Sequence, residues 1–198
     1  MHKWFIMLVT CLSLVGCSVF KPMPRQTINN YELGALSLPS KQPIAASGRI
    51  ILVSNTTSSP GYETNGIVYS KSPYQLNTYT QNRWVAPPAQ LFNQALVSSL
   101  RKSHYFKAVA TIPYIGLHDF RLDTQLLELK QDLSNQQLRM SVAAQLVDSK
   151  KQTIIASKQF SVNTATLPNP KAAVNDANKA QALMLSQIVD FCLTQAKH

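Results

Sequence analysis

The chain has 198 residues, with 19 Lys and Arg against 9 Asp and Glu, so its formal net charge is +10. Nine acidic residues and four histidines are a small supply for acid–base catalysis, and six glycines leave little room for a phosphate-cradling loop. The length suits one domain of ordinary size, and the scattered Lys and Arg residues indicate a solvated basic surface rather than one binding stripe.

The first 17 residues, MHKWFIMLVTCLSLVGC, have the pattern of a bacterial lipoprotein signal. Their apolar run from Trp4 to Val15 is too short for a bilayer core of about 30 Å, which takes roughly 20 residues. Such a segment is typical of a targeting peptide that is removed. The ending Leu-Val-Gly-Cys resembles a lipobox, so we expect residues 1–16 to be the signal peptide and Cys17 to carry the lipid. The alternative is a plain secretory signal with a chance cysteine at its end.

A lipid on Cys17 would hold the protein on a membrane, and several acyl chains would make that attachment stable where one binds only reversibly. Ser18 follows the cysteine, where lipoproteins kept in the inner membrane often have Asp. We therefore expect an outer-membrane anchor with the domain in the periplasm, a compartment that argues against nucleic acid as a partner. Residues 17–30 indicate a tether, because they hold two prolines and no periodicity, and residues 31–198 the domain.

Short strands and turns are predicted in the first half of the domain. An extended segment begins at Tyr31, and the β-branched run at 50–53 suits a strand covered on both faces. A loop is expected over residues 55–66, followed by two short strands, 67–69 and 75–79, that pair like a hairpin. A helix is expected from about residue 87 to 103, because its prolines fit a first helical turn and its apolar residues recur at helical spacing.

Three strands and a helix are predicted after residue 118. In the first strand the apolar phase slips after residue 124, which predicts a bulge near Leu126. Residues 138–146 alternate like a half-buried strand, 148–151 form a turn, and 154–162 return as its partner. The final helix, from about residue 171 to 196, places the free Cys192 in an apolar stripe.

This order of elements has no regular βαβ alternation and predicts an α+β protein. We expect a single domain with a mostly antiparallel or mixed β-sheet and two main helices packed on one face. Once Cys11 leaves with the signal and Cys17 is acylated, Cys192 is the only remaining cysteine, so no intrachain disulfide is available.

The sequence indicates no catalytic, metal or cofactor site. None of Gly-x-Ser-x-Gly, His-Glu-x-x-His, a P-loop or Cys-x-x-Cys occurs in it. His118 and Asp119 are the one suggestive neighbouring pair, on which a periplasmic hydrolase would have to depend. Adjacent strand residues point to opposite faces, so we expect a structural or solvated role for both and no enzyme.

Aromatic residues are concentrated within 23 positions of a loop-and-hairpin region that has few charges. Tyrosine and tryptophan favour interfaces because they bury a large area at a small cost in side-chain entropy. The other interpretation is that they border the core. The residues are Tyr62, Tyr69, Tyr74, Tyr79 and Trp84.

Several short motifs together resemble one family of lipoproteins. Besides the lipobox and the strand at 50–53, they are Tyr31-Glu32-Leu33, Pro60-Gly61-Tyr62-Glu63, Ile67-Val68-Tyr69, Arg83-Trp84-Val85-Ala86-Pro87-Pro88 and Tyr105-Phe106. On these motifs nearly the whole mature chain resembles the ABC-type transport auxiliary lipoproteins, the group of the paraquat-inducible C lipoprotein. The Arg-Trp-x-x-Pro entry to a helix is the most distinctive, whereas residues 54–57 depart from the commoner pattern.

The resemblance implies an outer-membrane docking subunit, without catalysis, for an MCE (mammalian-cell-entry) lipid transport system. In these systems an inner-membrane ABC transporter works with an MCE-domain protein that crosses the periplasm, and some auxiliary lipoproteins assemble as homo-oligomeric rings. Arg83 and Trp84 match the family motif, either as partner contacts or as anchors of the helix start, and they join the four tyrosines as candidate partner-binding residues. The alternative from another class is a pilot or assembly lipoprotein for a secretin or a peptidoglycan-associated complex.

Overall fold

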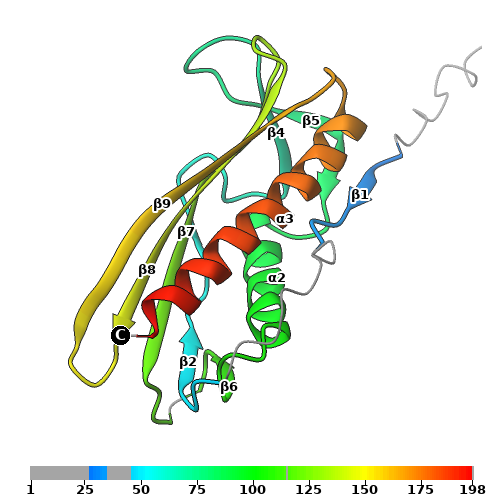
Figure 1. Cartoon of the computed structure of the whole chain (residues 1–198). Coiled ribbons are helices and arrows are strands. Elements are labelled where there is room, and N and C mark those ends of the chain that lie inside the picture. The colour runs from blue at the N-terminus through cyan, green and yellow to red at the C-terminus, as the bar shows by residue number, and fades with distance from the viewer. Residues whose placement is uncertain (1–26, 35–45, 115, 198) are drawn as a thin grey trace, which may run out of the picture.

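A mixed sheet of nine strands packs against two helices in the computed structural model of the chain, which describes residues 27–34, 46–114 and 116–197 (Figure 1). This confirms the predicted α+β domain. The predicted signal peptide and Cys17 lie outside the described residues.

Three long strands form a regular antiparallel ladder: β7 (Phe120–Asp132), β8 (Gln137–Asp148) and β9 (Thr153–Ala165). They are joined by short turns and pair along almost their whole length. The pairing of β7 with β8 shifts register between Leu126 and Glu128, which confirms the bulge predicted near Leu126. We call these three strands the ladder.

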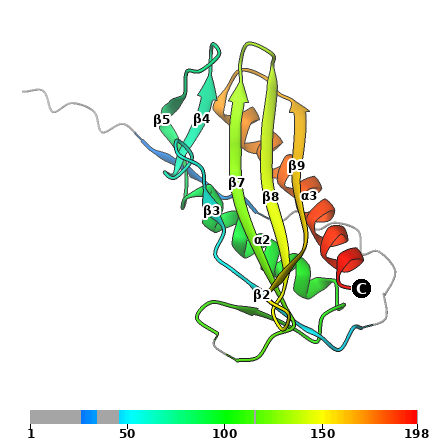
Figure 2. The same cartoon turned by 90° about the vertical axis from the view of Figure 1, so that its left-hand side faces the viewer.

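The other side of β7 is built from short strands laid end to end. β2 (Ile50–Val53), β3 (Thr57–Ser58) and β4 (Gly66–Ser70) run parallel to β7 and pair with its beginning, middle and end (Figure 2). Beyond them, β6 (Ala108–Thr111) pairs with β2, β5 (Asn77–Trp84) pairs with β4, and β1 (Asn29–Tyr31) pairs with β5. We call strands β1 to β6 the composite side.

The composite side departs from the sequence prediction in two ways. Four strands, rather than three, lie between the helices, because the half-exposed residues of β6 become a strand by pairing with β2. β5 continues to Trp84, so Arg83 and Trp84 end a strand instead of opening the helix. The first strand of the domain, β1, begins at Asn29.

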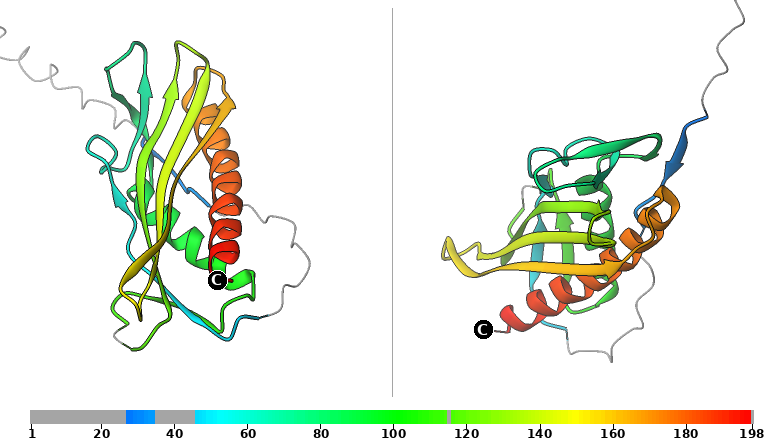
Figure 3. Two further views of the ribbon diagram at one scale, coloured as in Figure 1. Left: turned by 60° about the vertical axis from the view of Figure 1, so that its left-hand side comes forward. Right: turned by 90° about the horizontal axis from the view of Figure 1, so that it is seen from above.

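The two helices lie on the same side of the ladder (Figure 3). α2 (Pro88–Lys102) has its prolines at the start and two basic residues in its last turn, as predicted. α3 (Pro170–Gln195) is capped by Asn169, whose side-chain oxygen accepts a hydrogen bond from the Ala172 backbone N–H at 2.8 Å. α3 packs on β8, β9 and α2, and Cys192 lies fully buried between them.

The connections between elements gather at two opposite ends of the ladder. The loop end, at the top of Figure 1, consists of the β4–β5 connection (71–76), the β7–β8 turn (133–136) and the β9–α3 connection (166–169). The far end consists of the β6–β7 connection (112–119) and the β8–β9 turn (149–152). Both names are used below in this sense.

Candidate docking surfaces

Trp84 lies in the core where β1, β5 and α2 meet. Its side chain is 2% exposed, its backbone N–H donates to the Asn65 carbonyl at 2.8 Å, and its strand partner across from β5 is Tyr31. Because side chains alternate along a strand, the neighbouring Arg83 points outward, and its Nε donates to Asn30 Oδ1 at 3.0 Å. The Arg-Trp pair therefore places one residue in the core and one on the surface.

Tyr62 also belongs to the core rather than to an open surface. It is 8% exposed, and its carbonyl accepts a hydrogen bond from Ser58 Oγ at 2.9 Å, which closes the connection between β3 and β4. Burial, with a smaller contribution from the charge of Glu128, raises the pKa of Tyr62 to about 12. Its ring stabilises the connection instead of offering a contact to a partner.

Tyr69 and Tyr79 form a stacked pair across β4 and β5, with ring centroids 4.6 Å apart. The Tyr79 hydroxyl donates to Oε1 of the fully buried Gln131 at 2.7 Å, and partial burial raises the pKa of Tyr79. The side-chain amide of Gln131 in turn donates to the Leu167 carbonyl at 2.5 Å. This chain of hydrogen bonds joins the composite side to the ladder and to the start of α3.

Tyr74 differs from the other candidates because its side chain is fully exposed. It lies at the loop end with a backbone φ of 64°, a left-handed conformation that residues other than glycine rarely adopt. The structure thus divides the six candidates into three pairs. Tyr74 and Arg83 are exposed, Tyr69 and Tyr79 are half-buried, and Tyr62 and Trp84 are buried.

His118 and Asp119 have separate structural partners. The His118 ring nitrogen Nδ1 is 3.1 Å from the Gly116 carbonyl, whereas Asp119 accepts hydrogen bonds from the Ile50 backbone N–H at 2.8 Å and from Lys150 Nζ at 2.7 Å. These two bonds, the Lys150 bond first, hold the pKa of Asp119 below its ordinary value. Within residues 27–34, 46–114 and 116–197, no cluster of His, Cys, Asp and Glu has the geometry to hold a metal ion.

Sequence reasoning missed a set of large apolar side chains exposed at the two ends of the molecule. Leu76 and Leu167 stand at the loop end with Tyr74, and Leu117 and Ile154 stand at or beside the far end. Leu76 and Leu167 each lie within three residues of a proline in a connection, and this was the available signal.

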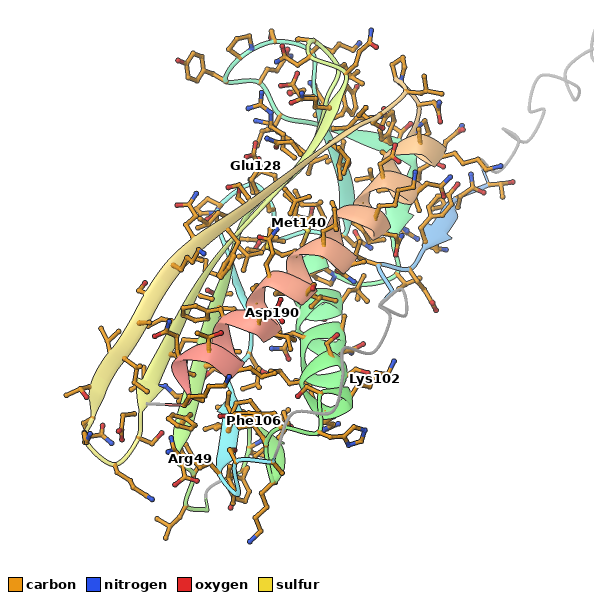
Figure 4. All side chains as sticks on the ribbon, in the orientation of Figure 1. Arg49, Lys102, Phe106, Glu128, Met140 and Asp190 are labelled. Atoms are coloured by element: carbon orange, nitrogen blue, oxygen red, sulfur yellow. The ribbon has the colours of Figure 1, made fainter. Side chains whose placement is uncertain are left out.

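β9 presents a second open feature, because it pairs with β8 alone among the described strands. Beside it, the C-terminal half of α3 and β9 enclose an open hollow of about 540 Å³. Phe160 and Phe191 meet edge to face in its wall at 5.7 Å, and Asp190 lies on its helix side (Figure 4). A long strand with one unpaired edge is a template for adding another strand.

The described residues form an α+β domain with exposed apolar side chains at its two ends and one open strand edge. No helix in the described part of the chain is long and apolar enough to cross a membrane. A family model for the ABC-type transport auxiliary lipoprotein component matches residues 31–189. The chain belongs to this family, as its motifs predicted.

Solved structures share the fold at low sequence identity. A Xanthomonas campestris protein assigned to the family model DUF330 is 19% identical, with a TM-score of 0.74, and the match covers 86% of this chain and 97% of that one. A second, uncharacterized protein is 16% identical, with a TM-score of 0.68 and coverage of 83% and 97%. A weaker likeness, with a TM-score of 0.45 and 14% identity, is to the PelC dodecamer of Paraburkholderia phytofirmans, covering 73% of this chain and 90% of that one. Among curated protein sequences, none matches the chain.

Proposed function

We propose that this chain is a periplasmic lipoprotein, anchored in the outer membrane through Cys17, that serves as the docking subunit of an MCE/ABC-type lipid transport system and catalyses no reaction. The family match over residues 31–189 carries this proposal, because it makes the chain an auxiliary component of ABC-type transport. The lipoprotein signal in residues 1–17 supports the anchor. The partners are an MCE-domain protein and the subunits of its ABC transporter.

Docking needs side chains that are accessible on the folded domain. Tyr74 and Arg83 meet this condition fully, and the tyrosine pair of β4 and β5 meets it in part, whereas Tyr62 and Trp84 are buried. Arg83 lies beside β1 on the composite side, where it is bonded to Asn30 but keeps an exposed guanidinium. We assign Arg83 to contact with the transport partner.

The homo-oligomeric ring is part of the same proposal. The 13-residue β9 has one edge without a strand partner among the described residues, and the hollow beside it is lined in part by the half-buried Phe191. A second copy that contacts this edge would cover both. Light scattering of the detergent-solubilised lipoprotein should give a mass several times that of one chain, and a monomer at every protein concentration would contradict the ring.

Affinity capture of the full-length lipoprotein from detergent-solubilised envelopes, followed by mass spectrometry, tests the partners. We expect an MCE-domain protein and ABC transporter subunits. Recovery of a secretin or of wall-associated proteins instead would support the pilot or peptidoglycan alternative. Replacing Cys17 by Ala should release the protein from membranes, and continued tight attachment would contradict the anchor.

Two arginine variants test which surface of the domain contacts the captured partner. Arg83 and Arg101 are both exposed, and each donates one hydrogen bond to a neighbouring element, Arg83 to Asn30 and Arg101 to the Val109 carbonyl. Arg83→Gln should reduce the recovery of the MCE-domain protein, whereas Arg101→Gln should leave it unchanged. Equal recovery with both variants would remove Arg83 from the interface.

A further inference from the structure

The loop end exposes three large apolar side chains, two on the β4–β5 connection and one on the β9–α3 connection. Leu76 is 44% exposed, Leu167 is 66% exposed and Tyr74 is fully exposed, although water is an unfavourable surrounding for all three. The left-handed backbone of Tyr74 lies inside a turn in which the Gln75 N–H donates to the Ser72 carbonyl. The turn therefore holds an aromatic ring away from the core that it could otherwise have joined.

Hydrogen bonds fix the three connections of the loop end into one surface. Ser134 Oγ donates to the Lys71 carbonyl at 2.7 Å, which joins the β7–β8 turn to the β4–β5 connection. The Thr166 N–H donates to the Gln136 carbonyl at 3.0 Å, which joins the same turn to the β9–α3 connection. The three connections, which carry the apolar side chains, therefore brace one another, and we call them the braced platform.

The same platform carries positive charge. Asp132 is its acidic residue, and that carboxylate is paired with Arg139 at 3.3 Å and accepts hydrogen bonds from Ser134 and Asn135. Lys71 and Lys171 are both exposed and add to the positive charge. Among the described residues of this end, neither forms an ion pair with a carboxylate. Exposed lysines beside an aromatic ring and leucines suit a surface of anionic lipid headgroups over an apolar layer.

The direction of β1 indicates which end faces the anchor. β1 runs parallel to β5, with Asn29 opposite Asn82, and β5 begins at the loop end with Asn77. The N-terminal end of β1 therefore faces the loop end (Figure 1). From Cys17 to Asn29 the chain spans at most about 40 Å, more than the roughly 17 Å that five strand residues cover between Asn82 and Asn77.

We propose that the loop end rests on the anionic surface of the membrane that holds the anchor, with Tyr74, Leu76 and Leu167 among the lipid headgroups. The far end then faces into the periplasm, so its exposed Leu117 is free for a protein partner. This inference rests on the proposed anchor at Cys17 and does not depend on the identity of the transport subunits.

Single cysteines at the two ends test this orientation in the full-length lipoprotein. Tyr74→Cys and Leu167→Cys mark the loop end, and Leu117→Cys, whose exposure of 92% lies between theirs, marks the far end as a matched control. Cys192 stays unlabelled because it is fully buried and its thiol pKa is raised to about 12. Each variant is labelled with an environment-sensitive fluorophore and placed in vesicles of phosphatidylethanolamine and phosphatidylglycerol that contain a nitroxide-labelled lipid.

We expect blue-shifted emission and strong nitroxide quenching for the two loop-end labels, with neither effect for Leu117→Cys. Equal quenching at both ends, or quenching at Leu117→Cys alone, would overturn the orientation. Loop-end labels that stay in water until captured transport subunits are added would overturn the membrane assignment in favour of a protein. Failure of the transport capture would leave these outcomes unaffected, so the two proposals fail separately.

Charge reversal tests the role of the anionic headgroups. Lys71→Glu with Lys171→Glu should abolish most of the quenching of the Leu167→Cys label. The matched pair Lys102→Glu with Lys107→Glu changes the net charge equally near the opposite end, where α2 terminates (Figure 4), and should leave the quenching intact. Unchanged quenching with Lys71→Glu and Lys171→Glu would show that anionic headgroups do not hold the loop end on the membrane.

Discussion

The ladder and the composite side belong to one sheet but are held together by different means. Strands of the ladder follow one another in the chain and pair over 12 to 13 residues, so their contacts are local in sequence. Strands of the composite side have two to eight residues. Apart from the local pairing of β4 with β5, they find partners far along the chain, as Ile50 does with Asp119, 69 positions away. The ladder is the scaffold, and the composite side carries the candidate docking residues on a few long-range contacts.

Trp84→Ala should have the largest effect, because it removes the largest buried side chain from the composite side. We expect the free energy of unfolding, measured with urea, to fall by about 3–5 kcal/mol. Amide exchange should accelerate more in β1 and β5 than in β8. Equal acceleration in both regions would show that the two sides of the sheet open as one unit, and a loss within about 0.5 kcal/mol, as expected for the exposed Tyr74→Ala control, would contradict the core role of Trp84.

Gln131→Leu should come next, because Gln131 is the buried polar residue that connects Tyr79 to the β9–α3 connection. Its loss leaves the Leu167 carbonyl without its short hydrogen bond, and we expect a cost of about 1–3 kcal/mol. A double-mutant cycle with Tyr79→Phe measures how much of this cost is shared. If the two losses in unfolding free energy simply add, Gln131 and Tyr79 do not act together in connecting the ladder to the composite side.

Asp119→Asn should have a smaller effect that depends on pH. The folded protein holds the pKa of Asp119 below its ordinary value of 3.8, so the charged carboxylate stabilises the fold above that pH. This stabilisation is lost as the pH falls below about 4 and through the lower folded-state pKa. Because Lys150 is largely exposed, we expect the variant to lose about 0.5–1.5 kcal/mol at neutral pH and to show a shallower acid slope in urea titrations. An unchanged acid slope would show that the negative charge of Asp119 does not contribute to its contacts with Ile50 and Lys150.

Cys192 should show the smallest effect, namely no reaction with thiol reagents in the native protein. The thiol is fully buried where α3 packs on the ladder, and desolvation raises its pKa to about 12. Labelling should become rapid only in denaturant, in step with loss of far-ultraviolet circular dichroism. Rapid labelling under native conditions would show that α3 separates from the ladder more easily than its packing indicates.

The sequence predicts the ladder better than the composite side for a physical reason. In β8 one face is covered by α3, so residues such as Leu138, Met140 and Val142 alternate with more polar neighbours. This two-residue period predicts a strand. β6 has no such signature, since its strand conformation depends on β2, which lies more than 50 positions earlier. Parallel pairing of three short strands along β7 likewise depends on contacts that local patterns do not record.

The candidate docking surfaces could likewise be predicted only in part from the sequence. The aromatic concentration supplied most of the candidate residues, but its members have unlike environments, since Trp84 is buried and Tyr74 is fully exposed. Sequence alternation along β5 does not state which face meets the core, because β4, β1 and α2 together decide it. The braced platform of the loop end depends on hydrogen bonds between three connections, which no single segment reveals.

The end-to-end arrangement of β2, β3 and β4 along β7 also orders events during synthesis. The N-terminal part of a chain emerges first, so the apolar run Ile50–Val53 appears well before β7, whose first residue pairs with Ile51. Until β6 and then β7 have been made, this run remains an unpaired, β-branched segment of the kind that aggregates. β2 therefore stays exposed on the nascent chain until its partner strands from the middle of the domain have been made.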